Sequence, residues 1–256
     1  LKVDRRHALL VVVEGDRLRR EGVEDGNKLF GAAILQKSDL SLVMAGTNNE
    51  IENPLNHGEI STLNAFYKLP IEGRPDTKDC VFVSTHEPCS LCLSAITWSG
   101  FDNFFYLFGY DDTRDAFKIP HDLKILSEVF NIQQGNYARK NAFWECRGLI
   151  EMSEAIGGDR AAKRAAQIER IRATYADLSA SYQAKKRDML ERALAIFERA
   201  YGRDHPSVAF PLANLGMLCR DLGDQAKARE YYGRAHAIWE RAYGPEHQMT
   251  QRARAC

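Results

Sequence analysis

The chain has 256 residues with 35 basic and 35 acidic side chains, and 45% of its residues are hydrophobic, a composition typical of a globular protein. No apolar run approaches the roughly 20 residues that span a bilayer, so we expect no membrane-spanning helix and a cytoplasmic location. The six cysteines are few and scattered, unlike the disulfide framework of a small secreted protein.

The N-terminal part alternates between strand-like and helix-like patterns. Short apolar runs bounded by turn residues predict four strands, at residues 29–35, 42–45, 80–84 and 104–108. Apolar spacing predicts helices at residues 7–23, from Ile60 onward, from Pro88 to Trp98, and at about 121–130. A fifth strand before Phe143-Trp144 cannot be placed. The alternation predicts a three-layer α/β/α domain over residues 1–155.

The character of the chain changes after Gly157-Gly158. Strand-like runs disappear, and Ala, Arg, Glu and Lys dominate, which is helical composition. The charge changes with it. Residues 1–155 carry 17 Lys and Arg against 23 Asp and Glu, a net charge of −6, and residues 156–256 carry +6. We therefore expect a second, all-α domain over residues 158–256.

This second part contains an internal repeat. Residues 195–202 (AIFERAYG) recur as residues 237–244 (AIWERAYG), 42 positions later. The pattern resembles the tetratricopeptide family, and its long period resembles the kinesin light-chain type. The first copy is five residues shorter between Leu178 and Phe197, so it is either degenerate or one long helix. Fewer than three such repeats rarely stand alone, so we expect them to dock on the first domain or to pair across a dimer. They could also bind a protein partner.

Four residues of the first part have the types and spacing of a metal site. His57 and Glu59 precede a predicted helix, and Cys89 and Cys92 begin another one 32 residues later. One imidazole and two thiolates are three zinc ligands, which leave a fourth tetrahedral position for water. Bound zinc lowers the pKa of that water, and Glu59 is close enough to exchange protons with it. The pattern predicts a catalytic Zn²⁺ site.

These residues resemble the cytidine and nucleobase deaminase superfamily over roughly residues 25–115. The segment HGEISTLNAFY, which begins at His57, is particularly similar to fungal cytosine deaminase. The segments FGAAI and Thr85-x-Glu87-Pro88-Cys89 are similar to that family and to its guanine- and tRNA-deaminating relatives. The resemblance implies a mixed sheet, catalysis by Glu59, and hydrolytic deamination of a small nucleobase, nucleoside or related amino-heterocycle. It also implies a homodimer.

Further substrate-binding residues are implied by the resemblance alone. They are Asn48 (with Asn49 as the alternative), Phe30, Gly58, Glu87, and an acidic residue after the fourth strand, which could be Asp112, Asp111 or Asp115. His86 adjoins Glu87 but is left out as a ligand, because the family varies at that position.

Three alternatives remain open. Cys80 could close a purely structural zinc site, although a strand separates it from the other ligands. The +6 C-terminal half could bind phosphates in a tRNA-specific adenosine deaminase, but the zinc half is acidic and suits a small substrate better. The chain could also be a repeat scaffold whose deaminase domain is vestigial, against which the complete ligand set argues.

Overall fold

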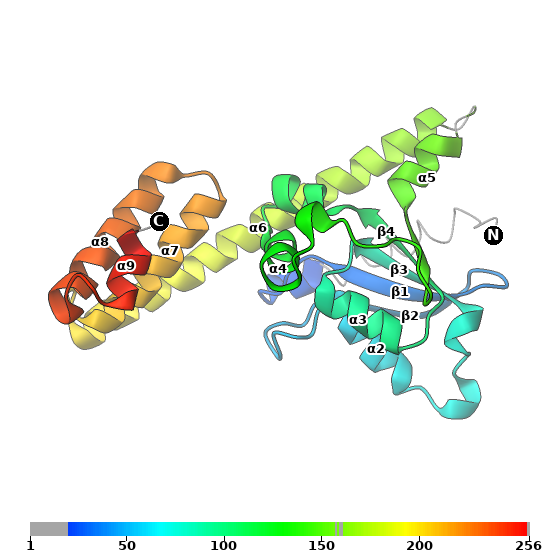
Figure 1. The fold of residues 1–256 in the computed structure, drawn as a ribbon, viewed down its shortest axis with the longest axis horizontal. Helices are drawn as coiled ribbons and strands as arrows, with labels where there is room; N and C mark the ends of the chain where they lie inside the picture. The colour runs from blue at the N-terminus through cyan, green and yellow to red at the C-terminus, as the bar shows by residue number, and fades with distance from the viewer. Residues whose placement is uncertain (1–19, 157, 159–160, 255–256) are drawn as a thin grey trace. The chain divides into compact units, whose positions relative to one another are not determined.

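The computed structural model describes residues 20–156, 158 and 161–254, and five strands of these residues form one mixed sheet (Figure 1). They are β1 (Gly31–Gln36), β2 (Leu42–Thr47), β3 (Cys80–His86), β4 (Asn103–Phe108) and β5 (Glu145–Gly148). The order across the sheet is β2-β1-β3-β4-β5, with β1 antiparallel to both neighbours and β3, β4 and β5 parallel. The predicted α/β class and mixed sheet are confirmed. The fifth strand was expected before Phe143-Trp144, but the short β5 follows Trp144 directly.

Helices flank this sheet. In the N-terminal part they are α2 (Gly58–Tyr67), α3 (Ser90–Trp98), α4 (His121–Phe130) and α5 (Leu149–Ile156). Short 3-10 turns lie at Ile71–Gly73, Thr77–Asp79 and Gln133–Gly135, and a π-helical turn lies at Asp112–Ala116. Phe66 of α2 and Ile96 of α3 pack with Phe82 of β3 on one side of the sheet. The alternate residues Val81 and Val83 pack on the other side, as expected for a strand between two layers.

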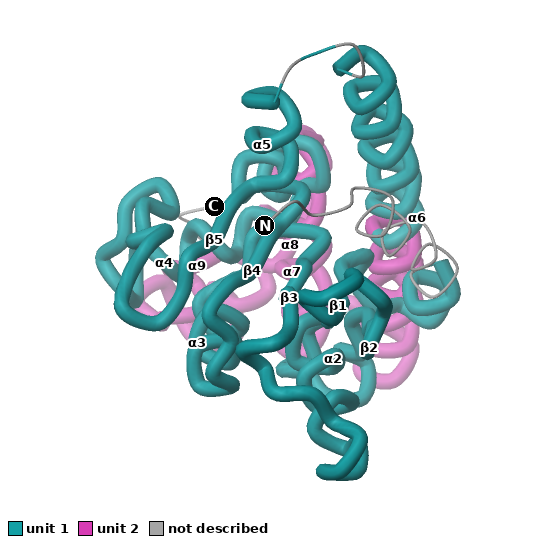
Figure 2. The backbone as a smooth tube through the Cα atoms, turned by 90° about the vertical axis from the view of Figure 1, so that its right-hand side faces the viewer, with its two compact units in different colours: residues 1–182 teal, residues 183–256 magenta. Residues whose placement is uncertain are grey.

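The next helix, α6 (Ala161–Tyr201), is a single helix of 41 residues. The open question about the first repeat copy is therefore answered in favour of one long helix. The chain separates into two compact units within this helix, between Tyr182 and Gln183 (Figure 2). This boundary lies farther along the chain than the change of composition at Gly158. Its residues Ile171, Tyr175 and Leu178 pack with Phe108 and Phe117 of the first unit.

The second unit is a helix–turn–helix array. It contains the end of α6, a 3-10 turn at Pro206–Val208, α7 (Ala209–Asp221), α8 (Gln225–Tyr243) and α9 (Gln248–Arg254). Leu212 of α7 and Trp239 of α8 are buried in a common core. The repeated sequence gives repeated contacts, because the rings of Tyr201 and His205 lie 4.9 Å apart and those of Tyr243 and His247 lie 4.7 Å apart.

Two expectations concern the N-terminal residues and the membrane. The predicted helix at residues 7–23 lies mostly outside the described residues, of which residues 20–24 are helical. In the parts of the chain that the structure describes, no helix has both the length and the apolar character needed to cross a bilayer.

Candidate active site

The first functional histidine stands at the start of α2. His57 is the N-cap of this helix, and Glu59 lies in its first turn, where the positive end of the helix dipole favours an acidic residue. Glycine is required between them, since a Cβ on Gly58 would lie 2.6 Å from Gly31 Cα. Gly58 N donates to Asn48 Oδ1 at 3.0 Å. This close packing on β1 fixes where His57 and Glu59 point.

The cysteines stand at the start of α3, just beyond the end of β3. Cys89 is the N-cap and Cys92 lies in the first turn, so both sulfurs are near the helix N-terminus, which favours the thiolate. Tyr110 Oη donates to the carbonyl of Pro88 at 2.6 Å. This contact anchors the turn that delivers Cys89.

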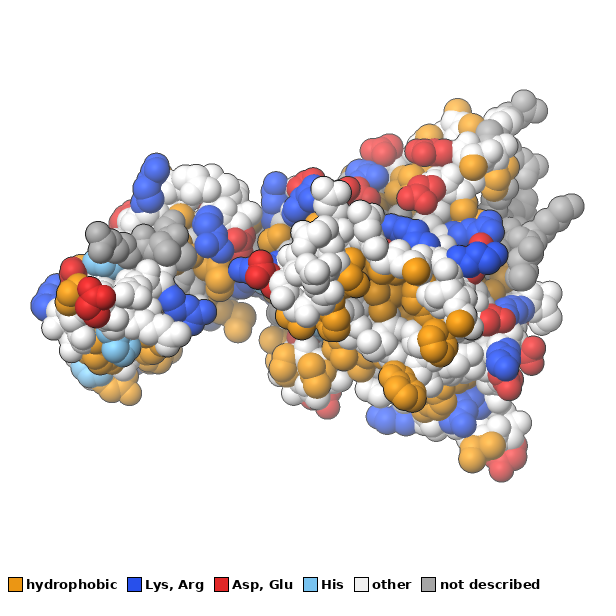
Figure 3. Space-filling view, in the orientation of Figure 1, with side chains coloured by type: hydrophobic (Ala, Val, Ile, Leu, Met, Phe, Trp, Pro, Cys, Tyr) orange, Lys and Arg blue, Asp and Glu red, His pale blue; other side chains and the backbone are white. Residues whose placement is uncertain are grey.

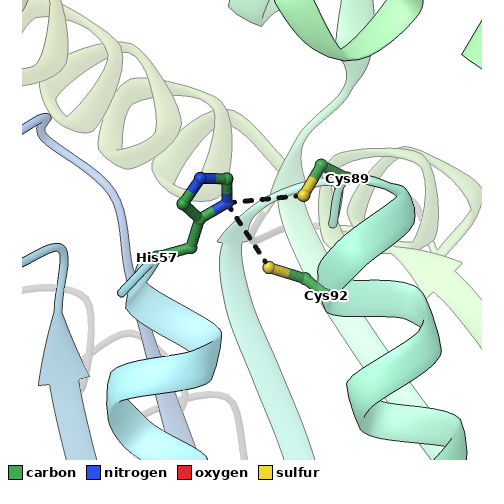
Figure 4. Close-up of side chains that lie close together, drawn as sticks. All are labelled: His57, Cys89 and Cys92. Carbon is green, nitrogen blue, oxygen red and sulfur yellow. Dashed lines mark hydrogen bonds between the residues drawn. The ribbon is translucent and has the colours of Figure 1, made fainter. Parts of the chain in front are cut away.

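These three side chains converge as a zinc site requires (Figure 4). Their ligand atoms all lie within 4.8 Å of one another, and His57 Nδ1 lies 3.4 Å from Cys89 Sγ and 3.7 Å from Cys92 Sγ. Nitrogen and sulfur ligands of one tetrahedral zinc lie about 3.6 Å apart at ordinary bond lengths. The three residues therefore fit Zn²⁺.

Cys80 is not part of this group. It begins β3 and is fully buried in the core beside α2 and α3, about 20 Å along the strand from its far end at the usual rise per residue. Among the described residues, the only convergent set of metal-ligand type is His57, Cys89 and Cys92. The structure thus gives no support to a four-ligand structural site that includes Cys80.

The two thiols differ strongly in acidity. A hydrogen bond from Cys92, and then the hydrogen bond to His57, lower the pKa of the Cys89 thiol. The same contact with Cys89, together with burial, raises the pKa of Cys92. The hydrogen bond to Cys89 also raises the pKa of His57. Cys89 is thus the more acidic of the two thiols, and a bound cation would displace the proton from Cys92.

Glu59 lies directly beside the ligands and is completely buried. Its Oε1 accepts a hydrogen bond from Ser84 Oγ at 2.8 Å, and its Oε2 lies 3.3 Å from Cys92 Sγ. Burial, with the nearby charge of Cys89, raises the pKa of Glu59 to about 7. A carboxyl group with such a pKa can both accept and donate a proton at neutral pH.

Behind the metal ligands lies an ion pair that the sequence did not indicate. His57 Nε2, the ring nitrogen that faces away from the cysteines, lies 3.6 Å from Glu50 Oε1. The same oxygen pairs with Lys28 Nζ at 2.6 Å, and Lys28 N donates to Glu50 Oε2 at 3.3 Å. A carboxylate at the distal nitrogen of a metal-binding histidine orients its ring and makes it a better ligand.

The structure brings two further predicted residues to this site. Asn48 is buried and bonded to Gly58, and its backbone N–H donates to Phe30 O at 3.1 Å. Asn49 instead bonds to Glu52 in the loop, which favours Asn48 of the two asparagines. Phe30 is buried and stacks on His86, with ring centroids 3.9 Å apart and an interplanar angle of 18°.

The carboxylate of Glu87 is held by hydrogen bonds and an ion pair within the protein. Its carboxylate accepts hydrogen bonds from Tyr137 Oη at 2.8 Å and Tyr110 N at 3.2 Å, and pairs with Arg139 at 3.0 Å. These contacts support the turn before Cys89, and its role toward a substrate stays a prediction.

The acidic residues after β4 also have partners. Asp112 pairs with Arg172 of α6 and accepts from Gly109 N at 3.2 Å. Asp111 and Asp115 both pair with Arg114, at 3.0 and 2.6 Å. Whether any of the three contacts a substrate likewise stays a prediction.

Another acidic residue, the half-buried Asp122, lies in the first turn of α4. Burial and the charge of Cys89 raise the pKa of Asp122 to about 7, and Lys28, His57 and Glu50 also act on it. Sequence reasoning missed Asp122, Glu50 and Ser84 because none lies in the ligand motif. An acidic residue at a helix start was the one available signal, and it usually indicates only the helix dipole.

Comparison with known families agrees with this geometry. Residues 11–108 match the cytidine and deoxycytidylate deaminase zinc-binding region, and residues 170–241 match the tetratricopeptide repeat. The N-terminal part of the chain thus carries the zinc-binding region of these deaminases, and the C-terminal part carries a tetratricopeptide repeat. Both predicted resemblances, and zinc as the metal of the site, are confirmed.

The chain matches only part of the length of each individual relative. The chain is 31% identical over 99 residues to guanine deaminase of Bacillus subtilis, covering 38% of this chain and 61% of that protein. It is 26% identical over 87 residues to a probable cytosine deaminase of Schizosaccharomyces pombe, covering 34% and 51%. The chain therefore spans between half and two thirds of these two relatives.

Two solved structures are similar to part of this chain. Guanine deaminase from Nitrosomonas europaea matches at 19% identity and a TM-score of 0.43, covering 66% of this chain and 82% of that one. The B. subtilis guanine deaminase structure matches at 25% identity and a TM-score of 0.40, covering 57% and 90%. Both TM-scores are below 0.5, so the superpositions add nothing to the sequence matches.

Proposed function

We propose that this chain is a zinc-dependent hydrolytic deaminase that releases ammonia from a small amino-substituted heterocycle, a nucleobase or nucleoside. The observation that carries the proposal is the position of Glu59. Its fully buried carboxylate lies 3.3 Å from Cys92 Sγ, within a cluster of three zinc ligands. A structural zinc site needs no buried proton carrier beside it, whereas hydrolysis does.

The residues of the site divide the chemistry among them. His57, Cys89 and Cys92 would hold the zinc, which would supply Lewis-acid activation of water. Glu59, with a pKa near 7, would accept a proton from that water and pass it to a ring nitrogen. It would then take up the second proton of that water, from the hydroxyl group added to the ring carbon, and give it to the leaving amine as ammonia departs. The backbone N–H groups at the start of α3 would stabilise negative charge that develops there.

The ring itself would be held by side chains of the first unit. The Asn48 Oδ1 atom accepts a hydrogen bond from Gly58 N–H, which leaves its amide nitrogen as a donor for a carbonyl oxygen of the substrate. Phe30 would pack against the ring with the face that His86 does not cover. These two roles were implied by the family resemblance. The bond of Asn48 to Gly58, next to His57, and the bond of its backbone N–H to Phe30 O support them.

Asp122 favours guanine among the candidate bases. A carboxylate accepts hydrogen bonds in pairs, and guanine presents two adjacent donors, its ring N–H and its 2-amino group. Asp122 lies close enough to Cys89 and His57 that their charges act on its pKa. The 31% identical relative is named guanine deaminase, which points the same way.

An ammonia-release assay tests the proposal. The zinc-loaded chain would be incubated with guanine, cytosine, adenine, their nucleosides, and pterin- or triazine-like analogues. We expect release from guanine above all, and we expect Asp122→Ala to raise the KM for guanine. Ammonia from none of these compounds, with salt-dependent binding of tRNA, would favour the tRNA-specific alternative.

We propose that the chain forms a homodimer through an apolar face of the first unit. Apolar side chains gather on the face over α3 and α4 (Figure 3). They are the exposed residues Leu91, Trp98, Ile125, Val129 and Phe130. Exposed apolar side chains gathered on one face mark association sites. Light scattering should give twice the chain mass, and Trp98→Glu should give the mass of one chain.

The tetratricopeptide repeat is proposed to bind a protein partner. The deaminase chemistry above uses no residue of the second unit. Deaminase activity that is unchanged after removal of residues 183–256 would fit a separate binding module.

A further inference from the structure

Two residues near the end of β3 lie beside the carboxylate of Glu59. Ser84 and His86 are two residues apart on a strand, so their side chains lie on the same face. Ser84 Oγ donates to Glu59 Oε1 at 2.8 Å, and His86 Nδ1 lies 3.7 Å from the same oxygen. The other carboxylate oxygen, Oε2, faces Cys92 Sγ at 3.3 Å. The carboxylate therefore has one oxygen toward β3 and the other toward the metal ligands.

His86 is held rigidly in this position. It is 2% exposed, and its ring stacks on Phe30 with an interplanar angle of 18°. The neighbouring Thr85 Oγ1 accepts from Gly31 N at 2.9 Å, which ties this end of β3 to the residue after Phe30. The stack restrains the plane of the imidazole, whose Nδ1 lies on the side of Glu59.

The Nδ1 atom of this ring has no hydrogen-bond partner among the described residues. The atom is also buried, an arrangement that is costly and rare in folded proteins. His86 does not belong to the convergent metal-ligand group. A purely apolar role would be better filled by leucine or phenylalanine, which carry no buried polar atom. Glu59 Oε1 lies 3.7 Å from Nδ1, and catalytic hydrogen bonds that are long in the empty enzyme often shorten when substrate binds.

We propose that His86 is a positioning residue for Glu59. As the Nδ1–H tautomer it would donate to Oε1 together with Ser84, so that Oε2 is the oxygen that receives and returns the transferred proton. This rests on the proton-carrying role of Glu59 in the proposed function. Burial lowers the pKa of His86 to about 3, so the ring is neutral at physiological pH and has one N–H to donate.

The tautomer is measurable without any enzymatic activity. The zinc-loaded full-length chain would be labelled with ¹⁵N-histidine, and long-range ¹H–¹⁵N correlation would report the protonation of each ring nitrogen. The His86→Asn variant identifies the signals of His86. We expect a neutral ring protonated at Nδ1, with signals that move in Glu59→Gln. A ring protonated at Nε2 overturns the proposal, and this reading stands even if no deaminase activity is found.

Kinetics provide the second test, with two amides as a matched pair. Asn places its amide nitrogen where Nδ1 stands, whereas Gln places it near Nε2, so only His86→Asn retains the donor. We expect kcat to fall about tenfold or more in His86→Gln and His86→Leu, with KM and zinc content within about twofold, because a misplaced catalytic group loses rate steeply. His86→Asn should retain kcat within about threefold.

Equal kcat in the Asn and Gln variants, whether retained or lost, would overturn the positioning role. Circular dichroism and zinc analysis of each variant separate misfolding from lost positioning. If His86→Leu fails to fold, the comparison of Asn with Gln still decides. Absence of turnover in the unaltered chain would reject the proposed function and leave the tautomer measurement to decide the role of His86.

Discussion

Ser179 Oγ in α6 donates a hydrogen bond to the backbone carbonyl of Phe117, at 2.6 Å. One turn earlier on the same helix, Tyr175 is fully buried against Phe108 and Phe117, with ring centroids 5.0 and 5.6 Å apart. The segment after β4 therefore owes part of its packing to a helix whose composition belongs to the repeat region. The first compact unit extends to Tyr182.

Tyr175→Ala should lower the free energy of unfolding of the first unit by about 3 to 5 kcal/mol, the usual cost of removing a buried aromatic ring. Chemical denaturation followed by aromatic fluorescence measures it. Tyr201→Ala is the control, because Tyr201 is 56% exposed and lies in the second unit.

The same packing predicts that a chain ending at residue 182 keeps its zinc and fold, whereas one ending at residue 158 does not. Equal stability of the two truncated chains would contradict this division.

Glu59→Gln should retain zinc and fold but lose turnover by about a hundredfold to ten-thousandfold, the range expected for removal of a general acid–base group. The amide keeps the size of the side chain and the contact with Ser84 but cannot carry a proton. Ammonia release and zinc content should be measured on the same preparation. Glu72→Gln, at an exposed residue far from the ligands, is the matched control. Turnover that survives in Glu59→Gln would remove Glu59 from the proposed mechanism.

Glu50→Gln should weaken zinc binding by about ten- to a hundredfold, the range seen when the partner of a metal-binding histidine is removed. Glu50 Oε1 lies 3.6 Å from His57 Nε2 and also pairs with Lys28. Competition with a chromophoric chelator measures the affinity without reference to activity. Glu52→Gln changes an exposed carboxylate on the same loop and should leave the affinity unchanged. If both variants bind zinc equally well, Glu50 does not orient His57.

The buried His86 should make the first unit sensitive to acid. In the unfolded chain a histidine takes up a proton below about pH 6.5, whereas burial lowers the pKa of His86 in the folded chain to about 3. The unfolded state thus binds more protons between these values. The free energy of unfolding should therefore fall as the pH drops below 6.5, by at most about 1.4 kcal/mol per pH unit from this group.

Denaturation of the unaltered chain and of His86→Asn at several pH values from 7 to 5 isolates this contribution. Every other titrating group, including the zinc ligands, is common to both proteins. The variant should lose less stability on acidification than the unaltered chain. Parallel curves would show that His86 is not the group responsible.

The sequence is sufficient for the parts of the site that depend on local spacing. His57 and Glu59 share one helix start and Cys89 and Cys92 share another, so residue type and order already indicate a three-ligand zinc centre. The strands β1 to β4 follow from apolar runs, whereas β5, only four residues long with an exposed Arg147, has no such pattern.

Contacts between distant segments could not be foreseen. Glu50 comes within 3.6 Å of His57 from a loop, and the charges of Cys89 and His57 act on the pKa of Asp122 in α4. His86 stacks on Phe30 and lies 3.7 Å from Glu59 Oε1. The division of α6 at residue 182 likewise depends on which aromatic residues Tyr175 meets. Composition places the boundary between the two parts at Gly158, before residue 182. Residues 161–182 have a helical composition, and this does not reveal which unit they pack on.

X-ray absorption at the zinc edge of the purified full-length chain tests the central claim most directly. The account predicts one zinc per chain, with two sulfur ligands at about 2.3 Å and two nitrogen or oxygen ligands at about 2.0 to 2.1 Å, of which one is water. Three or more sulfur ligands, or a chain that holds no zinc, would contradict it.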